Sequence, residues 1–193
     1  MFSHDAIFDT TVVFMHYSEI TQFWFDEIKP KKWFEKDEDF DSLLSNMFLK
    51  QVELGLKGKL NIWNKNIGGC LGLILLLDQF TRNIFRDTPK AFEGDSQALD
   101  LSLDAIKKGY LNEKNSGWRH FLLMPLMHSE NLAIQEMSLP LFQNYTNEKT
   151  YSFAKRHYDI IKRFSRFPHR NQLLGRVSSR EEVLFLAEPG SSF

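Results

Sequence analysis

The stretch LGLILLLDQFTRNIFR, residues 71–86, predicts a helix with one apolar face and one polar face. Its apolar residues recur at the three- and four-residue steps typical of an α-helix: Leu73, Leu76, Leu77, Phe80 and Ile84. Its polar residues are Asp78, Gln79, Arg82, Asn83 and Arg86. Amide, guanidinium and carboxylate groups form forked hydrogen bonds, and arginine is favoured in buried pairs with carboxylate or phosphate. We therefore expect this polar face to contact either other buried protein groups or a ligand.

Helical patterns continue through the rest of the chain. Apolar residues fall at helical steps in residues 40–52 and again in residues 153–164. No stretch shows the alternation of a β-strand, and the connecting segments are short. We predict an all-α fold of antiparallel helical hairpins. The 193 residues suit a single domain, residues 1–193, in which residues 1–15 form a loosely ordered N-terminal extension.

The composition argues against several classes of protein. A formal net charge of −1 is not that of a nucleic-acid-binding protein, which needs a basic surface. The single cysteine, Cys70, cannot build a disulfide framework or a cysteine-based zinc cluster. The longest apolar run, residues 70–77, is far shorter than the roughly 20 residues of a membrane span, and the first residues lack the basic region of a signal peptide. We expect a cytoplasmic protein that binds neither nucleic acid nor membrane.

Four segments resemble those of one bacterial family. They are LLLDQFTRNIFRDTPKAF (75–92), FLLMPLMHSENLAIQE (121–136), RHYDIIKRFSRFPHRNQLLGR (156–176) and FLAEPGSSF (185–193). In this order they resemble the domain of unknown function 924 family over about residues 23–193. The resemblance implies tetratricopeptide-like helical hairpins and implies no activity. Thr81 and Arg180 stand where the family often has proline, and Trp118 where it often has an acid, but the DQF-RN, HSE and FPHRN residues are kept.

The HSE segment, residues 128–130, follows an apolar stretch and has two interpretations. It marks a helix junction, with Ser129 as the cap and Glu130 in the first turn. Alternatively, it supplies an acid–base pair in which His128 is the general base and Glu130 orients it. The second interpretation makes His128 and Glu130 the candidate catalytic residues.

The FPHRN segment, residues 167–171, lies between two predicted helices. Pro168 predicts the first turn of a short helix, whose unpaired N–H groups would favour an anion. That anion is either a protein carboxylate, which makes a structural clamp, or the phosphate or carboxylate of a ligand. On the clamp interpretation, we expect Asp78 to pair with an arginine such as Arg166 or Arg170.

On the pocket interpretation, the polar segments bind a small anionic molecule or an acidic peptide. Arginines would hold the anion and asparagines would orient it. His157 lies on an apolar stripe, as a core histidine does, but it is close in sequence to the FPHRN segment. The candidate ligand-binding residues are Asp78, Gln79, Arg82, Asn83, Arg86, His157, His169, Arg170 and Asn171. No histidine pair has the spacing of a helical zinc site, so we predict no metal and no cofactor.

Three functions fit these residues. The first is a binding protein for a small anionic molecule or an acidic peptide. The second is an enzyme, a hydrolase or transferase, in which arginines stabilise developing negative charge. The third is a helical scaffold for protein–protein interaction.

Overall fold

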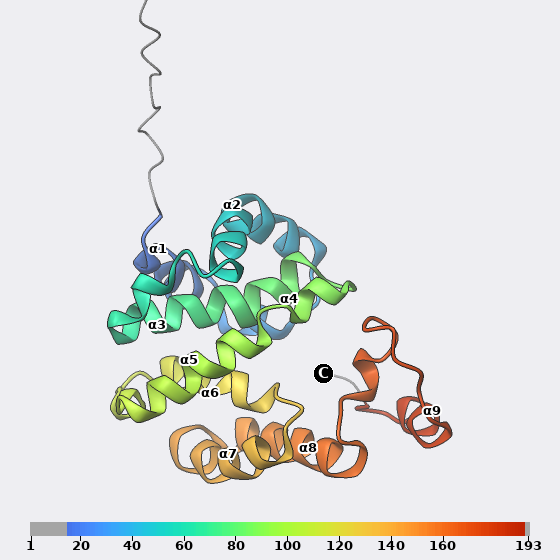
Figure 1. The fold of residues 1–193 in the computed structure, drawn as a ribbon. Helices are drawn as coiled ribbons and strands as arrows, with labels where there is room; N and C mark the ends of the chain where they lie inside the picture. Colours follow the sequence, from blue (N-terminus) through green and yellow to red (C-terminus); the bar gives the residue numbers. More distant parts are fainter. Residues whose placement is uncertain (1–14, 192–193) are drawn as a thin grey trace, which may run out of the picture.

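The structure is a computed structural model that describes residues 15–191, and all of its regular elements in this range are helical (Figure 1). The prediction of an all-α fold is confirmed. The α-helices are α1 (Tyr17–Gln22), α2 (Glu38–Leu56), α3 (Ile67–Ile74), α4 (Thr81–Ile84), α5 (Asp95–Lys107), α6 (Ser116–Met127), α7 (Leu132–Tyr145), α8 (Glu148–Phe164) and α9 (Arg180–Leu186). The expected extension lies outside the described residues except for Met15, which packs against the core.

The predicted helix of residues 71–86 is present as a nearly continuous rod at the centre of the fold (Figure 1). It consists of α3, a π-helical turn (Leu75–Phe80) and α4. α2 packs on one side of this rod, and α5 and α6 pack on another. Seven of the eight residues of α3 and all six of the π-helical turn are buried, because neighbouring helices cover the rod on several sides.

The core of the molecule is aromatic and lies around the rod. The rings of Trp24 and Phe80 are 5.2 Å apart, those of Trp24 and Phe121 are 5.6 Å apart, and those of Phe48 and Phe80 are 5.0 Å apart. All four side chains are buried. Rings in tilted and edge-on contact each bury a large area, so this cluster ties α2, α6, the rod and the π-helical turn after α1 (Phe23–Glu27) into one core.

Helices α5 to α8 follow one another in space, each packed against the next (Figure 1). After α8 the chain leaves this layer through a left-handed residue, Ser165. Residues 165–191, the C-terminal arm, contain a short 3-10 helix (Pro168–Arg170) and α9. Phe167 packs with residues of α8 in a small apolar cluster that is separate from the main core.

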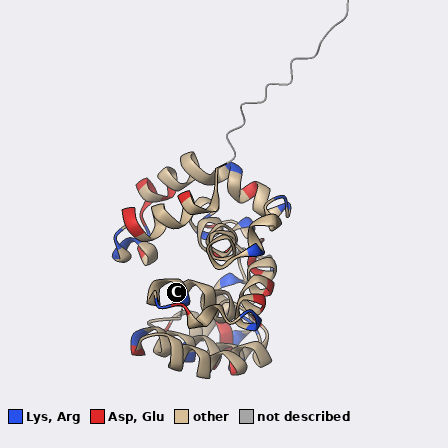
Figure 2. Cartoon of the chain, turned by 90° about the vertical axis from the view of Figure 1, so that its left-hand side faces the viewer, with Lys and Arg blue, Asp and Glu red and all other residues tan. Residues whose placement is uncertain are grey.

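The surface carries both signs of charge. Figure 2 shows acidic and basic residues interspersed along the helices. Among the described residues, no helix is both long and apolar enough to cross a membrane.

Candidate functional site

The π-helical turn sets the position of Asp78. A π-helical turn shifts the backbone hydrogen-bond pattern by one residue, and such turns are frequent at functional sites. Here, side chains of the next turn bind the backbone oxygens: Thr81 Oγ1 donates to the Leu77 carbonyl (2.8 Å) and Arg82 Nη1 donates to the Asp78 carbonyl (2.6 Å). The side chain of Asp78 is fully buried.

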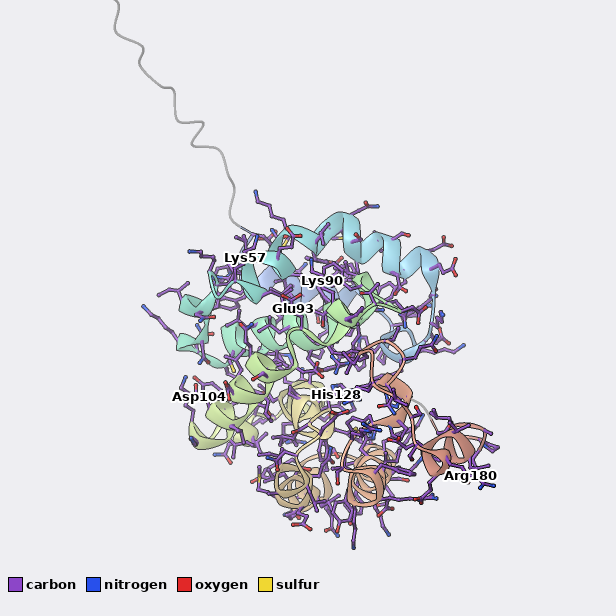
Figure 3. The ribbon with its side chains drawn as sticks, turned by 45° about the vertical axis from the view of Figure 1, so that its right-hand side comes forward. Lys57, Lys90, Glu93, Asp104, His128 and Arg180 are labelled. Atoms are coloured by element: carbon purple, nitrogen blue, oxygen red, sulfur yellow. The ribbon has the colours of Figure 1, made fainter. Side chains whose placement is uncertain are left out.

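Asp78 is bound to His128, which lies at the end of α6. Asp78 Oδ1 is 2.6 Å from His128 Nδ1, and Gln79 Nε2 donates to Asp78 Oδ2 (2.5 Å). Asp78 and His128 are 50 positions apart in the chain. His128 lies in the middle of the molecule, between the upper helices and the lower layer (Figure 3). The fold therefore joins two of the predicted polar segments at an Asp–His pair.

Two arginines and a second aspartate extend this pair into a chain of alternating charges. Arg82 Nη1 is 3.3 Å from Asp78 Oδ1, and Arg82 Nη2 is 2.9 Å from Asp95 Oδ1. Arg170 Nη1 donates to Asp95 Oδ2 (3.0 Å), and its Nη2 donates to the backbone carbonyl of His128 (3.1 Å). We call Asp78, Arg82, Asp95, His128 and Arg170 the central cluster.

The electrostatics of the central cluster favour an ionised Asp78 and a neutral His128. Burial works to raise the pKa of Asp78, but His128 and Arg82 outweigh burial and hold it below the ordinary range. Burial and the charge of Arg82 lower the pKa of His128, against the opposite effect of Asp78. Burial, followed by Arg82, lowers the pKa of Arg170 to about 10, so this guanidinium stays charged at neutral pH.

The expected pairing of Asp78 with Arg166 or Arg170 is wrong. Arg170 binds Asp95, and Arg166 binds Glu182 with a forked pair at 2.6 and 2.7 Å. Arg82, one helical turn from Asp78, reaches it directly, because residues four apart lie on the same face of a helix.

The expected orientation of His128 by Glu130 is also wrong. Arg176 donates to both carboxylate oxygens of Glu130, at 2.7 and 3.0 Å, and the backbone N–H of Phe167 donates to the same carboxylate (2.8 Å). Glu130 therefore faces the C-terminal arm, and the carboxylate bound to His128 is that of Asp78. The catalytic role of either residue stays a prediction.

The polar face of the 71–86 helix divides between two places. Asn83 and Arg86 do not join the central cluster. Asn83 Nδ2 donates to Asp41 Oδ1 (2.8 Å), and Arg86 binds Asp41 through Nε (2.5 Å) and Nη2 (2.8 Å). Their contacts are with α2, so these two residues fasten the rod to that helix.

The predicted residues His157 and His169 lie on the side of His128 that faces α8 and the C-terminal arm. The ring centres of His128 and His157 are 6.2 Å apart, those of His157 and Phe167 are 5.5 Å apart, and those of Phe167 and His169 are 5.6 Å apart. The buried His157 is bound through Nδ1 to the Phe153 carbonyl (2.8 Å), as a core histidine would be.

The predicted short helix at Pro168 is a 3-10 helix of three residues, and its N-terminus is not an open anion site. The backbone N–H of Phe167, the residue before this helix, donates to Glu130 Oε1 (2.8 Å), so a protein carboxylate lies at this end. The N–H groups of Arg170 and Asn171 are bonded within the turn, to the carbonyls of Phe167 (3.1 Å) and Pro168 (3.0 Å). Asn171 Nδ2 donates to Ser178 Oγ (3.0 Å), which ties the FPHRN segment to the rest of the arm.

A cavity of about 560 Å³ lies in the C-terminal arm. The described residues that line it are Pro168, His169, Gln172, Arg176, Ser178, Leu186 and Ser191. His128 is not among them. Burial lowers the pKa of His169 to about 4, so His169 is uncharged at neutral pH. The charge among the lining residues is then that of Arg176, which is paired with Glu130.

Two other observations bear on the chemistry available. Within residues 15–191 no group of three or more His, Cys, Asp or Glu side chains is arranged to hold a metal ion. Burial raises the pKa of the Cys70 thiol to about 12, so Cys70 is a core residue and not a nucleophile.

Two residues of the site had little signal in the sequence. Asp41 and Asp95 each lie in the first turn of a helix, where an acidic residue is common for its interaction with the helix dipole. Because the helix dipole already explains these two aspartates, the sequence gives no indication that Asp41 pairs with an arginine 45 positions away or Asp95 with one 75 positions away.

Comparison with known proteins shows which family the chain belongs to. No curated protein matches it. A solved structure of a protein of unknown function from Agrobacterium tumefaciens is similar, with 34% identity and a TM-score of 0.84 over 89% of this chain and 96% of the other. The model of a family described as bacterial protein of unknown function (DUF924) matches residues 20–190. The chain therefore belongs to the DUF924 family.

Proposed function

We propose that the protein is an enzyme in which His128 transfers protons and Asp78 orients it, acting on a small polar substrate. The observation that carries this proposal is the 2.6 Å contact between His128 Nδ1 and a fully buried carboxylate. Hydrolases and transferases commonly need such a positioned base.

The contact determines which nitrogen of His128 is basic. An ionised carboxylate only accepts hydrogen bonds, so His128 donates its Nδ1–H to Asp78. In the neutral ring the lone pair is then on Nε2. Because the pKa of His128 is lowered, this base is uncharged and available at neutral pH. His128 Nε2 would take the proton of a water or hydroxyl group as that group attacks the substrate.

The burial of the central cluster agrees with this division of roles. The side chain of Asp78 is 0% exposed, whereas those of His128 and Arg82 are 15% and 21% exposed. The orienting carboxylate of Asp78 therefore lies in the interior behind His128, and the imidazole of His128 is within reach of solvent. Arg82 lies beside the pair, where its charge would stabilise negative charge that develops on a substrate.

A small anionic ligand and a protein-binding scaffold remain the weaker proposals. Arg82 and Arg170 are paired with Asp95, and Arg86 is paired with Asp41. An anion would have to displace one of these carboxylates. The same ion pairs are what a purely structural network requires, so an experiment on His128 must separate that alternative from catalysis.

The first test is chemical modification, because it needs no substrate. Diethyl pyrocarbonate acylates accessible, neutral imidazoles, and peptide mass spectrometry identifies the residue. We expect modification of His128 in the folded protein at pH 6–7, with the exposed His16 as the internal reference. An unmodified His128 beside a fully modified His16 would contradict the proposal.

The second test is turnover. A panel of activated esters, phosphate esters, amides and glycosides would be screened with the wild type, His128→Gln and Asp78→Asn. Loss of a positioned base reduces rate by about 10²–10⁴-fold. Both variants should lose activity together, whereas Glu130→Gln, which removes the carboxylate that binds Arg176 of the arm, should keep most of it. Wild-type turnover by a folded His128→Gln variant would refute the proposal.

A further inference from the structure

We propose that Asp95 is the positioning residue of the Asp78–His128 pair: its carboxylate is the built-in anion of a two-arginine site. The inference rests on the proposed function for its catalytic meaning. It explains why two arginines, the half-buried Arg82 and the buried Arg170, meet beside a histidine: Asp95 supplies the negative charge between them.

The two carboxylate oxygens of Asp95 bind different arginines. Oδ1 is 2.9 Å from Arg82 Nη2, and Oδ2 accepts from Arg170 Nη1 at 3.0 Å. Each arginine then holds one member of the pair. Arg82 contacts the carboxylate of Asp78, and Arg170 donates to the backbone carbonyl of His128. Asp95 therefore binds both of the arginines that hold Asp78 and His128 in place.

Charge balance requires a carboxylate at this place. The guanidinium carbons of Arg82 and Arg170 lie 5.8 and 4.6 Å from the ring centre of Phe92, so the two cations are close to the same apolar surface. Two like charges in a partly dehydrated site repel strongly. Asp95 compensates this repulsion. Because its side chain is 20% exposed, a small solute can reach its position.

The backbone beside Asp95 is built for a close approach. Gly94 precedes α5, and a Cβ at this position would lie 2.2 Å from the carbonyl oxygen of Leu77. Real Cβ atoms do not come so near to a backbone oxygen. Gly94 thus lets the start of α5 sit directly on the π-helical turn, one residue before Asp78.

The charged and titratable groups that act on His128 come from every element packed around it. They are Asp78 and Arg82 of the central rod, Asp95 of α5, His120 of α6, His157 of α8, and His169 and Arg170 of the C-terminal arm. Of these, Asp78 and Asp95 raise the pKa of His128 and Arg82 lowers it. Loss of Asp95 should therefore move the titration of His128 to lower pH.

The test is chemical rescue of Asp95→Ala, with the imidazole titration of His128 followed by NMR. We expect the midpoint of His128 to fall in this variant and to return toward the wild-type value in sodium formate. Formate carries the missing carboxylate and fits the space that Asp95 leaves. Sodium chloride at the same ionic strength should restore much less. Asp95→Asn, which keeps the shape without the charge, should show the same fall and should not respond to formate.

Asp41→Ala is the matched control, because it also removes a carboxylate that binds an arginine, Arg86, which directly follows the same rod. Its His128 midpoint should stay at the wild-type value. The inference is overturned if folded Asp95→Asn titrates as the wild type, or if chloride restores Asp95→Ala as well as formate does. Failure of the proposed function is distinct: it appears as turnover by His128→Gln, which leaves the titration result unaffected.

Discussion

The main body and the C-terminal arm are held together by different forces. In the body, aromatic and aliphatic side chains from α1, α2, α3 and α6 form one continuous buried cluster. The arm has only a small cluster around Phe167, and it is attached chiefly by arginine–carboxylate pairs, such as Arg176–Glu130 and Arg170–Asp95. A further pair, Arg166–Glu182, holds the arm together internally. Even α9 leaves Val183 and Leu184 more than half exposed.

The difference has a consequence for stability and for the site. A continuous apolar core unfolds as a unit, whereas a segment with few buried apolar contacts opens locally. The arm supplies Arg170 to the central cluster, while the body supplies Asp78 and His128. The contact between Asp78 and His128 should therefore survive a local opening of the arm, whereas the hydrogen bond from Arg170 to the backbone of His128 should be lost.

The largest effect is expected from a cavity in the body. Phe121→Ala removes a fully buried ring that contacts Trp24 (5.6 Å) and Trp33 (5.1 Å). Truncation of a buried phenylalanine costs about 3–5 kcal/mol, so urea unfolding should shift as one cooperative transition. Phe34→Ala, at an exposed ring, should cost about 1 kcal/mol or less. Equal losses for both variants would show that the aromatic cluster is not a single core.

A smaller effect, confined to the arm, is expected from acid. Arg166 and the backbone N–H of Ser179 lower the pKa of Glu182 to about 2, from an ordinary value of 4.5. A lowered pKa in the folded state contributes stability above pH 4.5 that is lost as pH falls toward 2. Hydrogen exchange should therefore show residues 176–191 opening in this range before the body does.

Two variants sharpen the acid experiment. Glu182→Gln should open the arm already at neutral pH and remove its dependence on pH between 4.5 and 2. Glu181→Gln should change little, because its pair with Arg163 (2.9 Å) is solvent-exposed. Simultaneous loss of protection in the body and the arm would contradict a separate attachment of the arm.

The same contrast explains what could be predicted from the sequence. The stripe that ends in Phe80 and Ile84 predicted the central helix, because a periodic pattern reports which face is buried. The sequence also identified Asp78 and His128 as unusual polar residues. It did not indicate the π-helical turn, which leaves no periodic signature in so short a stretch.

The partners of the polar residues could not be predicted in the same way. Its position beside His128 in the sequence predicts that Glu130 orients that histidine, but Glu130 binds Arg176, 46 positions away. Which carboxylate an arginine meets depends on how helices pack, and a periodic pattern within one helix does not contain that information. The pairing of Asp95 with Arg82 and Arg170 has no sequence signal for the same reason.

The smallest effect is expected at the start of α9, where Ser179 and Glu182 form a capping box. Ser179 Oγ accepts from the N–H of Glu182 (3.2 Å), and the Glu182 carboxylate accepts from the N–H of Ser179 (2.7 Å). Ser179→Ala should cost about 1 kcal/mol, measured as faster exchange in α9, whereas Ser179→Thr should keep most of the cap. The loss of stability from Ser179→Ala should be slight in the body. It should be felt mainly in the arm, since the Glu182 carboxylate of this cap also binds Arg166. If Ser179→Ala lowers the urea midpoint of the whole protein as Phe121→Ala does, the arm and the body form one cooperative unit.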